Sequence, residues 1–159
     1  MLFAALLLSA CAILQAPVIP PGASMSDVQA RLGKPKDVVT ASGGDTVWQY
    51  PTGPFGSRTY IVTFGPDQRA RGFYQALTAD NFAKITMEMN RDDIRTMFGR
   101  PAETNTYRNL DEEVWSYRYQ GPIGQNRIFN VHFDVKTGLV RYTGDQEDPL
   151  YMQPLRGTG

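Results

Sequence analysis

One pattern of seventeen residues occurs twice in this chain of 159 residues, at 19–35 and again at 85–101. An Ile, an Asp, a Gly and a Pro recur at identical spacing in the two copies. They are Ile19, Asp27, Gly33 and Pro35 in the first copy and Ile85, Asp93, Gly99 and Pro101 in the second. An internal repeat of this length predicts that the chain folds as two copies of one supersecondary unit.

Each copy predicts one short helix, over 25–32 in the first and over 91–98 in the second. Ser24 and Asn90 can act as N-cap residues, and the Asp three positions later completes a capping box. A Gly just past the helix and a Pro two residues further on end it. Two apolar residues four positions apart give each helix one apolar face, which must be covered: these are Val28 and Leu32, then Ile94 and Phe98.

The duplication continues beyond the helices. A Trp-x-Tyr pair occurs at 48–50 and 115–117, a Gly-Pro-x-Gly loop at 53–56 and 121–124, and an aromatic-x-Val-x-Phe pattern at 60–64 and 129–133. The spacing between copies grows only across turns, where insertions are tolerated. Alternating apolar residues predict strands over 36–41, 46–50, 58–64, 70–76, 102–107, 113–119, 127–134 and 138–142, with a short helix over 80–85.

The predicted fold class is therefore α+β, with two tandem helix-plus-antiparallel-sheet repeats, each a two-layer α/β sandwich. We expect the first repeat over 22–76 and the second over 77–143. Residues 144–159 are polar and contain two prolines, so we expect a flexible tail there. Sixteen basic and sixteen acidic side chains cancel, which gives no indication of a nucleic-acid partner.

The N-terminal residues 1–10 are apolar and uncharged and are followed by Cys11, the single cysteine. The run is shorter than the roughly twenty residues that span a bilayer but suits a signal peptide. Leu8-Ser9-Ala10-Cys11 resembles the bacterial lipobox, in which the cysteine is lipid-modified and becomes the new N-terminus. We therefore expect a signal peptide over 1–10, a covalent lipid on Cys11 and a proline-rich tether over 11–21. The alternative is an incidental or buried cysteine. Residue 12 is Ala, not the Asp that would retain such a protein at the inner membrane, so the outer membrane is the expected location.

The second unit carries a family pattern over most of its length. Its residues are Leu77-Thr78-Ala79-Asp80-Asn81-Phe82, Ile85, Met89-Asn90, Ile94, Phe98-Gly99-x-Pro101, Trp115-x-Tyr117, Phe133 and Gly138. In order and spacing they resemble the SmpA/OmlA (BamE-type) domain of outer-membrane lipoproteins. The tandem arrangement is also similar to the β-lactamase inhibitor protein (BLIP-like) fold, in which two helix-plus-sheet units form one concave surface.

This resemblance implies a non-enzymatic lipoprotein at the periplasmic face of the bacterial outer membrane. It would act as a protein-binding scaffold, with partners in β-barrel protein assembly or envelope maintenance. Ala76 stands where single-unit members of the family carry an exposed Tyr, so a paralogous envelope lipoprotein of the same fold is an equal expectation. The alternative, from the BLIP-like arrangement, is an inhibitor or binding module directed at a periplasmic enzyme.

The residues predict no catalytic centre, cofactor or metal site. The single histidine, His132, alternates out of phase with Val131 and Phe133, so it should point away from the core to the surface. Metal sites of the common N/S kind need clustered His and Cys. The neighbouring carboxylates at 92–93 and 112–113 diverge on a helix or strand, so we expect Asp93 to be a cap residue and the other three to be solvated. An enzyme or small-ligand carrier would require a deep convergent pocket.

Four residues are candidates for contact with a partner. Phe55 and Ile123 occupy matching positions in the two Gly-Pro-x-Gly loops. Each can either dock a partner or lipid, or fold back and fix its own hairpin. Arg91 and Arg95 are four positions apart on the second helix and can either face phosphates or lie on a solvated helix surface.

Overall fold

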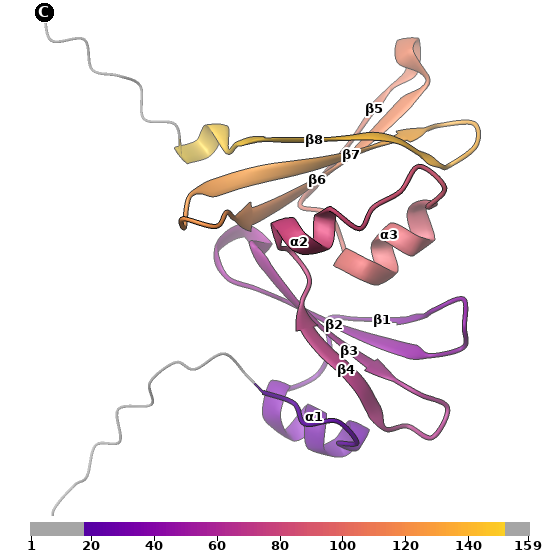
Figure 1. Ribbon diagram of the computed structural model, residues 1–159, viewed down its shortest axis with the longest axis vertical. Coiled ribbons are helices and arrows are strands. Elements are labelled where there is room, and N and C mark those ends of the chain that lie inside the picture. The colour runs from indigo at the N-terminus through magenta and orange to yellow at the C-terminus, as the bar shows by residue number, and fades with distance from the viewer. Residues whose placement is uncertain (1–17, 152–159) are drawn as a thin grey trace, which may run out of the picture.

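The computed structural model describes residues 18–151, which form three α-helices, eight strands and three short 3-10 turns (Figure 1). The first unit contains α1 (Met25–Leu32), β1 (Asp37–Thr40), β2 (Thr46–Thr52), η1 (Pro54–Gly56), β3 (Arg58–Phe64) and β4 (Ala70–Gln75). The second contains α2 (Ala79–Phe82), α3 (Arg91–Phe98), β5 (Glu103–Tyr107), η2 (Arg108–Leu110), β6 (Glu112–Gln120), β7 (Asn126–Asp134), β8 (Val140–Glu147) and η3 (Pro149–Tyr151).

The strands form two separate sheets of four, in the orders β1-β2-β3-β4 and β5-β6-β7-β8. Every neighbouring pair is antiparallel. The prediction of an α+β chain built from two helix-plus-sheet units is confirmed at this level. The two long helices and β3 have the predicted bounds, and the other seven predicted strands are present with shifted ends. The short second helix covers Ala79–Phe82 and not 80–85.

In the first unit, α1 covers one face of the first sheet. Ser24 accepts from the backbone N–H of Asp27, and the Asp27 carboxylate accepts from the backbone N–H of Ser24, which is the predicted capping box. The Ser24 hydroxyl also donates to this carboxylate at 2.6 Å, and the hydrogen bonds from its hydroxyl and its backbone N–H lower the pKa of Asp27. Val28 packs from the helix onto the even-numbered residues of β2 and β3. The core so formed contains Ile19, Val28, Trp48, Tyr50, Val62, Phe64 and Ala70.

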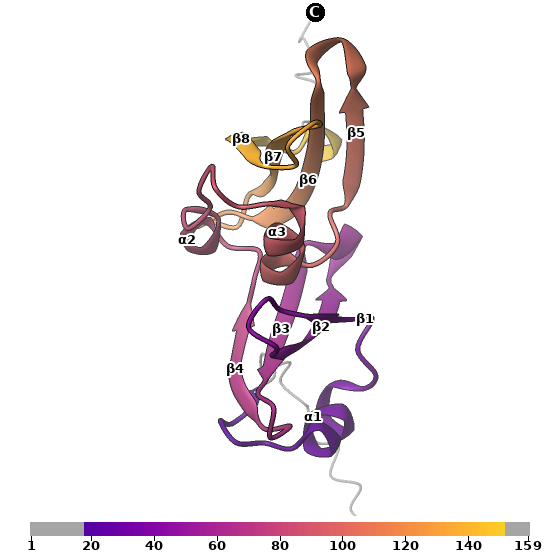
Figure 2. The same ribbon diagram turned by 90° about the vertical axis from the view of Figure 1, so that its right-hand side faces the viewer.

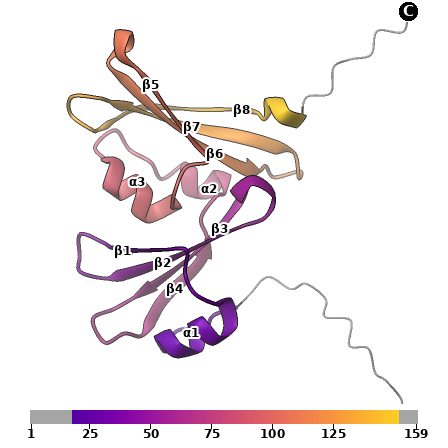
Figure 3. The same ribbon diagram turned by 180° about the vertical axis from the view of Figure 1, so that it is seen from behind.

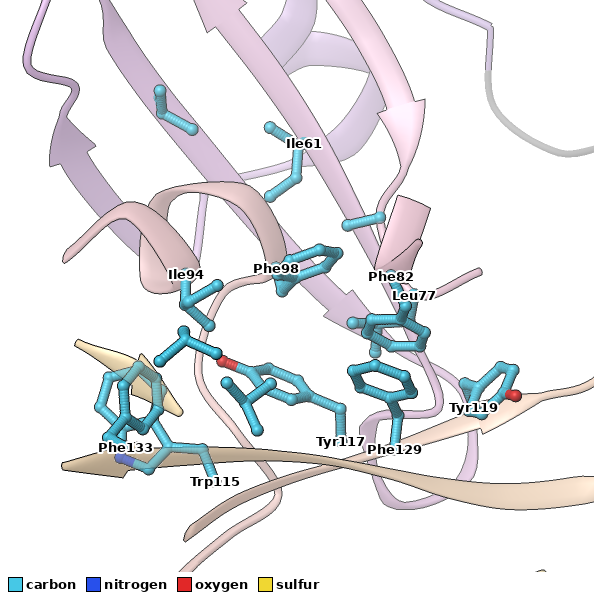
Figure 4. Packing of buried hydrophobic residues seen from close by; sticks show 14 residues of the cluster. Ile61, Leu77, Phe82, Ile94, Phe98, Trp115, Tyr117, Tyr119, Phe129 and Phe133 are labelled. Atoms are coloured by element: carbon cyan, nitrogen blue, oxygen red, sulfur yellow. The ribbon is translucent and has the colours of Figure 1, made fainter. Parts of the chain in front are cut away.

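In the second unit, α3 covers one face of the second sheet in the same way. Asn90 accepts from the backbone N–H groups of Asp92 and Asp93, and Asp93 accepts from that of Asn90. Figure 4 shows Ile94 and Phe98 of the helix above the aromatic side chains of the sheet. Phe82 from α2 adds an aromatic layer and stacks on Phe129 with ring centroids 4.1 Å apart.

This second core also includes residues of the first sheet, namely Val47 and Ile61. They lie on the face of that sheet opposite to α1, and Figure 4 shows Ile61 reaching toward α3 from above. The helix α3 is therefore buried between the two sheets. Along the long axis the layers are α1, first sheet, α2 with α3, and second sheet (Figures 1 and 2). Each unit is two-layered, and the two units are stacked.

Polar contacts fix α3 on the first sheet. Gln49 donates from Nε2 to the carbonyl oxygen of Arg95 at 2.8 Å, and the Tyr74 hydroxyl donates to that of Met97 at 3.2 Å. Asp37 pairs with Arg100 at 2.8 Å and with Arg95 at 3.7 Å. Tyr74 thus supplies a partner for a carbonyl group in the last turn of the helix, whereas the Arg95 carbonyl also accepts from the backbone N–H of Gly99.

The prediction of a flexible tail from residue 144 is wrong as far as Tyr151. Strand β8 continues to Glu147 because it pairs with the whole length of β7, from Arg127 to Phe133. The Asp148 side chain follows it into the interior, 1% exposed, and Arg118 donates to it at 3.1 Å. Beyond Val140 no residue of β8 is buried, so main-chain pairing with β7, and not an apolar face, holds this polar segment in the sheet. Residues 152–159 lie outside the described part.

Candidate functional site

The outer face of the second sheet, opposite to α3, carries an open groove of about 540 Å³. Its floor is formed by the residues of β6 and β7 that alternate with the core residues. Tyr107 and Leu110 line it at one end, and Pro149 and Leu150 line it at the other. The floor residues are Glu112, Val114, Ser116 and Arg118 from β6 with Ile128, Asn130 and His132 from β7.

The corresponding face of the first sheet is the one that α3 covers. Strand register makes the correspondence explicit, because one row of cross-strand partners runs over each sheet. In the first sheet this row is Asp37, Gln49, Ile61 and Tyr74, and in the second it is Glu103, Ser116, Asn130 and Gly144. The buried Ile61 is thus replaced by Asn130, and the face that is covered in one unit is polar and open in the other.

Two polar pairs organise the groove floor. The Ser116 hydroxyl donates to Asn130 Oδ1 at 2.7 Å across β6 and β7. Arg118 is held by the buried carboxylate of Asp148, which follows β8. Both pairs are internal, so the side chains are positioned before any ligand arrives. Pre-positioned polar groups on a partly apolar floor are typical of binding surfaces.

His132 points away from the core, as predicted, and its ring stacks on Tyr142 with centroids 4.1 Å apart. Glu112 lies beside it. The prediction that this carboxylate is solvated is wrong: the residue is only 6% exposed. Its Oε1 lies 3.2 Å from His132 Nδ1, within ion-pair distance, but the alignment is poor, and Nδ1 has no hydrogen-bond partner among the described residues. A hydrogen bond to Glu112 is the main cause of the raised pKa of Tyr142.

This cluster does not form a catalytic triad within residues 18–151. A triad requires a hydroxyl or thiol nucleophile hydrogen-bonded to the histidine. The nearby Ser116 hydroxyl donates to Asn130 instead. In the same part of the chain, no three His, Cys, Asp or Glu side chains come together as a metal site would need.

Phe55 and Ile123 both project into solvent, with 65% and 89% of their surfaces exposed. The reading in which they fold back onto their hairpins is therefore wrong. The two loops also lie at the same side of the molecule, where η1 contacts β6 (Figure 3). Arg58 beside the first loop donates to Gln120 beside the second at 2.8 Å. The Arg118 guanidinium lies 6.0 Å from the Phe55 ring centroid, so this side adjoins the groove.

Arg91 and Arg95 use their charges within the chain. Arg91 pairs with Glu113 at 2.6 Å and lies over the Phe133 ring. Glu113 also accepts from Trp115 Nε1 at 2.7 Å, so the prediction that this carboxylate is solvated is wrong as well. Arg95 faces Asp37 of the first sheet. Neither arginine lies on an open phosphate-binding surface.

Cys11 and the expected signal peptide lie outside the described residues. Between residues 18 and 151, no helix has both the length and the apolar character needed to cross a membrane.

The groove was not predictable from the expected two-layer units, because such a unit covers one face of its sheet and says nothing about the other face. A signal was nevertheless present. The first unit has Ile61 at a position where a solvated face does not need an apolar residue, while the second has Asn130 at the equivalent register position; Val47 and Val114 are alike. This difference indicates that one of the two outer faces is covered and the other is free.

Comparisons with known proteins add little to this description. No family model matches the sequence, and no curated protein matches it either. Among solved structures, the chain is similar to a DUF4309 family protein (YjgB) from Bacillus subtilis, with 12% identity over 79% of this chain and 78% of that one. The TM-score is 0.32, which is too low for the likeness to bear on fold or function.

Proposed function

We propose that this protein is a non-enzymatic scaffold that binds another protein through the outer face of its second sheet. We further propose that it is a lipoprotein anchored through Cys11 at the periplasmic face of the outer membrane. There it would serve β-barrel protein assembly or envelope maintenance, as a tandem form of the SmpA/OmlA (BamE-type) fold. The observation that carries the binding proposal is the open groove on a face whose counterpart in the first unit is covered by a helix.

Three features support protein binding over catalysis. The groove is shallow and spread over a sheet face, its polar pairs are mutually satisfied, and exposed apolar side chains at Phe55, Ile123 and Leu150 lie beside it or on its rim. A small-molecule site would be expected to enclose most of its ligand. Protein-docking surfaces combine apolar anchor residues with polar and charged groups, and this face offers both.

Capture from detergent-solubilised membranes tests this function, with Gly144→Arg as the blocking variant. A Cβ at Gly144 would meet only His132 Nε2, at 4.0 Å, so an arginine can extend over the groove without strain. Gly43→Arg in the β1–β2 turn is the matched control, since a Cβ there meets nothing within 4 Å. We expect the intact protein and the control to retain an envelope partner that Gly144→Arg loses. Equal capture by all three would refute the groove as the docking surface.

The identity of the captured protein separates the two binding hypotheses. Subunits of the barrel-assembly machinery would support the scaffold role. A single periplasmic hydrolase would support the alternative, a BLIP-like inhibitor or binding module.

The lipid anchor has its own test. Cys11→Ser should move the protein from the membrane fraction to the soluble fraction and change its mobility on a denaturing gel. Unchanged fractionation and mobility would show that Cys11 is not lipidated.

A further inference from the structure

We infer that the groove receives an amphipathic α-helix of the partner with basic residues near its C-terminal end, seated on the second sheet as α3 is seated on the first. This inference rests on the proposed protein-binding function and specifies what the partner presents. The template for this helix is α3, which covers the corresponding face of the first sheet within the chain. The mode of binding follows from the surface, because extended peptides join a sheet at its edge, whereas a sheet face is covered by helices or by another sheet.

Each sheet begins with an acidic residue on this face, and within residues 18–151 only the first of the two has basic partners. Asp37, the first residue of β1, pairs with two arginines of the second unit, Arg95 in α3 and Arg100 just beyond it. Glu103 is the first residue of β5 and has the same register position. It is exposed and lines the groove, where the Asn105 amide donates to it at 3.0 Å. Among the described residues no basic side chain pairs with Glu103.

The other two acids of the groove are buried. Glu112 is 6% exposed and lies beside His132, and Asp148 is 1% exposed and is bound by Arg118. Glu103 is therefore the carboxylate that a cation on the incoming helix would meet. An exposed acid whose counterpart binds two arginines indicates a partner with Arg or Lys near the end of its helix.

Side-chain hydrogen-bond donors on the sheet face also indicate a helix as the occupant. On the first sheet, Gln49 and Tyr74 donate to the carbonyl oxygens of the last turn of α3. On the second sheet, Ser116 and Asn130 stand in the same row. Asn130 Oδ1 accepts from Ser116, and no described residue accepts from the Asn130 amide nitrogen. That amide can donate to the carbonyl groups at the C-terminal end of a docked helix, which need partners.

A second copy of this chain is a poor occupant, although it carries a helix of the same length. The outer face of α1 has Arg31 where α3 has Met97, which is partly buried against the core, so an apolar contact is lost. Gln29 stands where α3 has Arg95. Polar residues at both free ends of a stack oppose open-ended association of copies. The proposed occupant of the groove is therefore a helix from another protein.

The test uses the unlipidated full chain (Cys11→Ser) and a synthetic peptide with residues 88–101 of this protein. A hydrocarbon staple joining positions 94 and 98 keeps the peptide helical. These two positions lie on the helix face that contacts the second sheet in the intact chain. The staple leaves Arg95, Met97 and Arg100 free. Nuclear magnetic resonance titration should shift the amide signals of Ser116 and Asn130.

Reversing the charges on the protein and on the peptide tests whether Glu103 meets the arginines of the helix. Glu103→Lys should weaken peptide binding about fivefold or more, and a peptide with Arg95→Glu and Arg100→Glu should bind this variant better than the wild type. Glu88→Lys, the same charge change at an exposed site outside the groove, should leave the affinity unchanged. The inference is overturned by absence of binding, by shifts confined to other surfaces, by affinity indifferent to Glu103, or by self-association of the full chain through α1. None of these results would affect the capture of a partner by the groove, which tests the proposed function separately.

Discussion

Gly33 and Gly99 show at the scale of single residues how the two repeats have diverged around one backbone conformation. Each follows its helix with φ near +80°, and ψ is −166° at Gly33 and −160° at Gly99. This region is almost restricted to glycine. Around Gly33 a Cβ would meet nothing within 4 Å, whereas at Gly99 it would lie 3.2 Å from Thr59 Cγ2 and 3.4 Å from Gln49 Oε1. Gly99 therefore serves both as a cap and as the point of close approach between α3 and the first sheet.

Substitution of the two glycines by alanine separates these roles. Gly33→Ala should lower the free energy of unfolding by roughly 1–3 kcal/mol through backbone strain alone. Gly99→Ala should lower it by about 1 kcal/mol more, since the methyl group also crowds the first sheet. Denaturant titration of both variants measures the difference. Equal losses would show that α3 does not approach the first sheet as closely as described.

Tyr50 makes a prediction for alkaline pH. Burial of its hydroxyl raises the pKa of Tyr50 to about 12. A group whose pKa is raised on folding contributes stability that is complete below its unfolded pKa, about 10, and is lost as the pH rises through the folded value. The free energy of unfolding should thus decline between about pH 10 and 12, and Tyr50→Phe should make the decline shallower. An identical decline in wild type and variant would contradict this assignment.

At the scale of elements, α1 and α3 have the same length and capping box but different surroundings. α1 contacts one sheet, and α3 contacts two. The bounds of both helices were predictable because the cap, the terminal glycine and the apolar spacing are local signals. The burial of α3 on two sides was not predictable in this way, since it depends on contacts between units. Met97 in place of Arg31 was the one local indication.

Removal of the caps should reveal this difference. Ser24→Ala and Asn90→Ala each remove an N-cap acceptor, at a cost of about 1 kcal/mol. Amide hydrogen exchange should accelerate only in α1 and the strands beneath it for Ser24→Ala, because α1 can detach alone. For Asn90→Ala it should accelerate in both sheets. Acceleration confined to the second unit in Asn90→Ala would contradict the shared role of α3.

At the scale of the whole molecule, residues 18–151 form a stack of alternating helical and sheet layers in which one sheet face is left free by the described residues. The sequence predicted the two units and all eight strands, because the repeat and the alternation are strong signals. It did not predict the order of stacking, because that order depends on Val47 and Ile61, which lie out of phase with the predicted core. The end of β8 was missed for a related reason: its pairing with β7, and not an apolar pattern, holds residues 144–147 in the sheet.

Sharing of α3 predicts that both units unfold together. Trp48 lies in the first core and Trp115 in the second, so Trp115→Phe and Trp48→Phe leave one reporter in each unit. Ile61→Ala, which opens a cavity against α3, should cost about 2–5 kcal/mol. In that background the fluorescence of both single-tryptophan forms should change with one midpoint. Two separated midpoints would show that the units are independent.

The central claim is that the free face of the second sheet is where this protein meets its partner. The most direct measurement is photo-crosslinking in intact cells, with a photoreactive residue at Asn130 in the groove or at Ala30 on the exposed face of α1. The account predicts one dominant protein adduct from position 130, little from position 30, and loss of the adduct when Gly144→Arg is added. Absence of an adduct at position 130, or equal adducts from both positions, would contradict it.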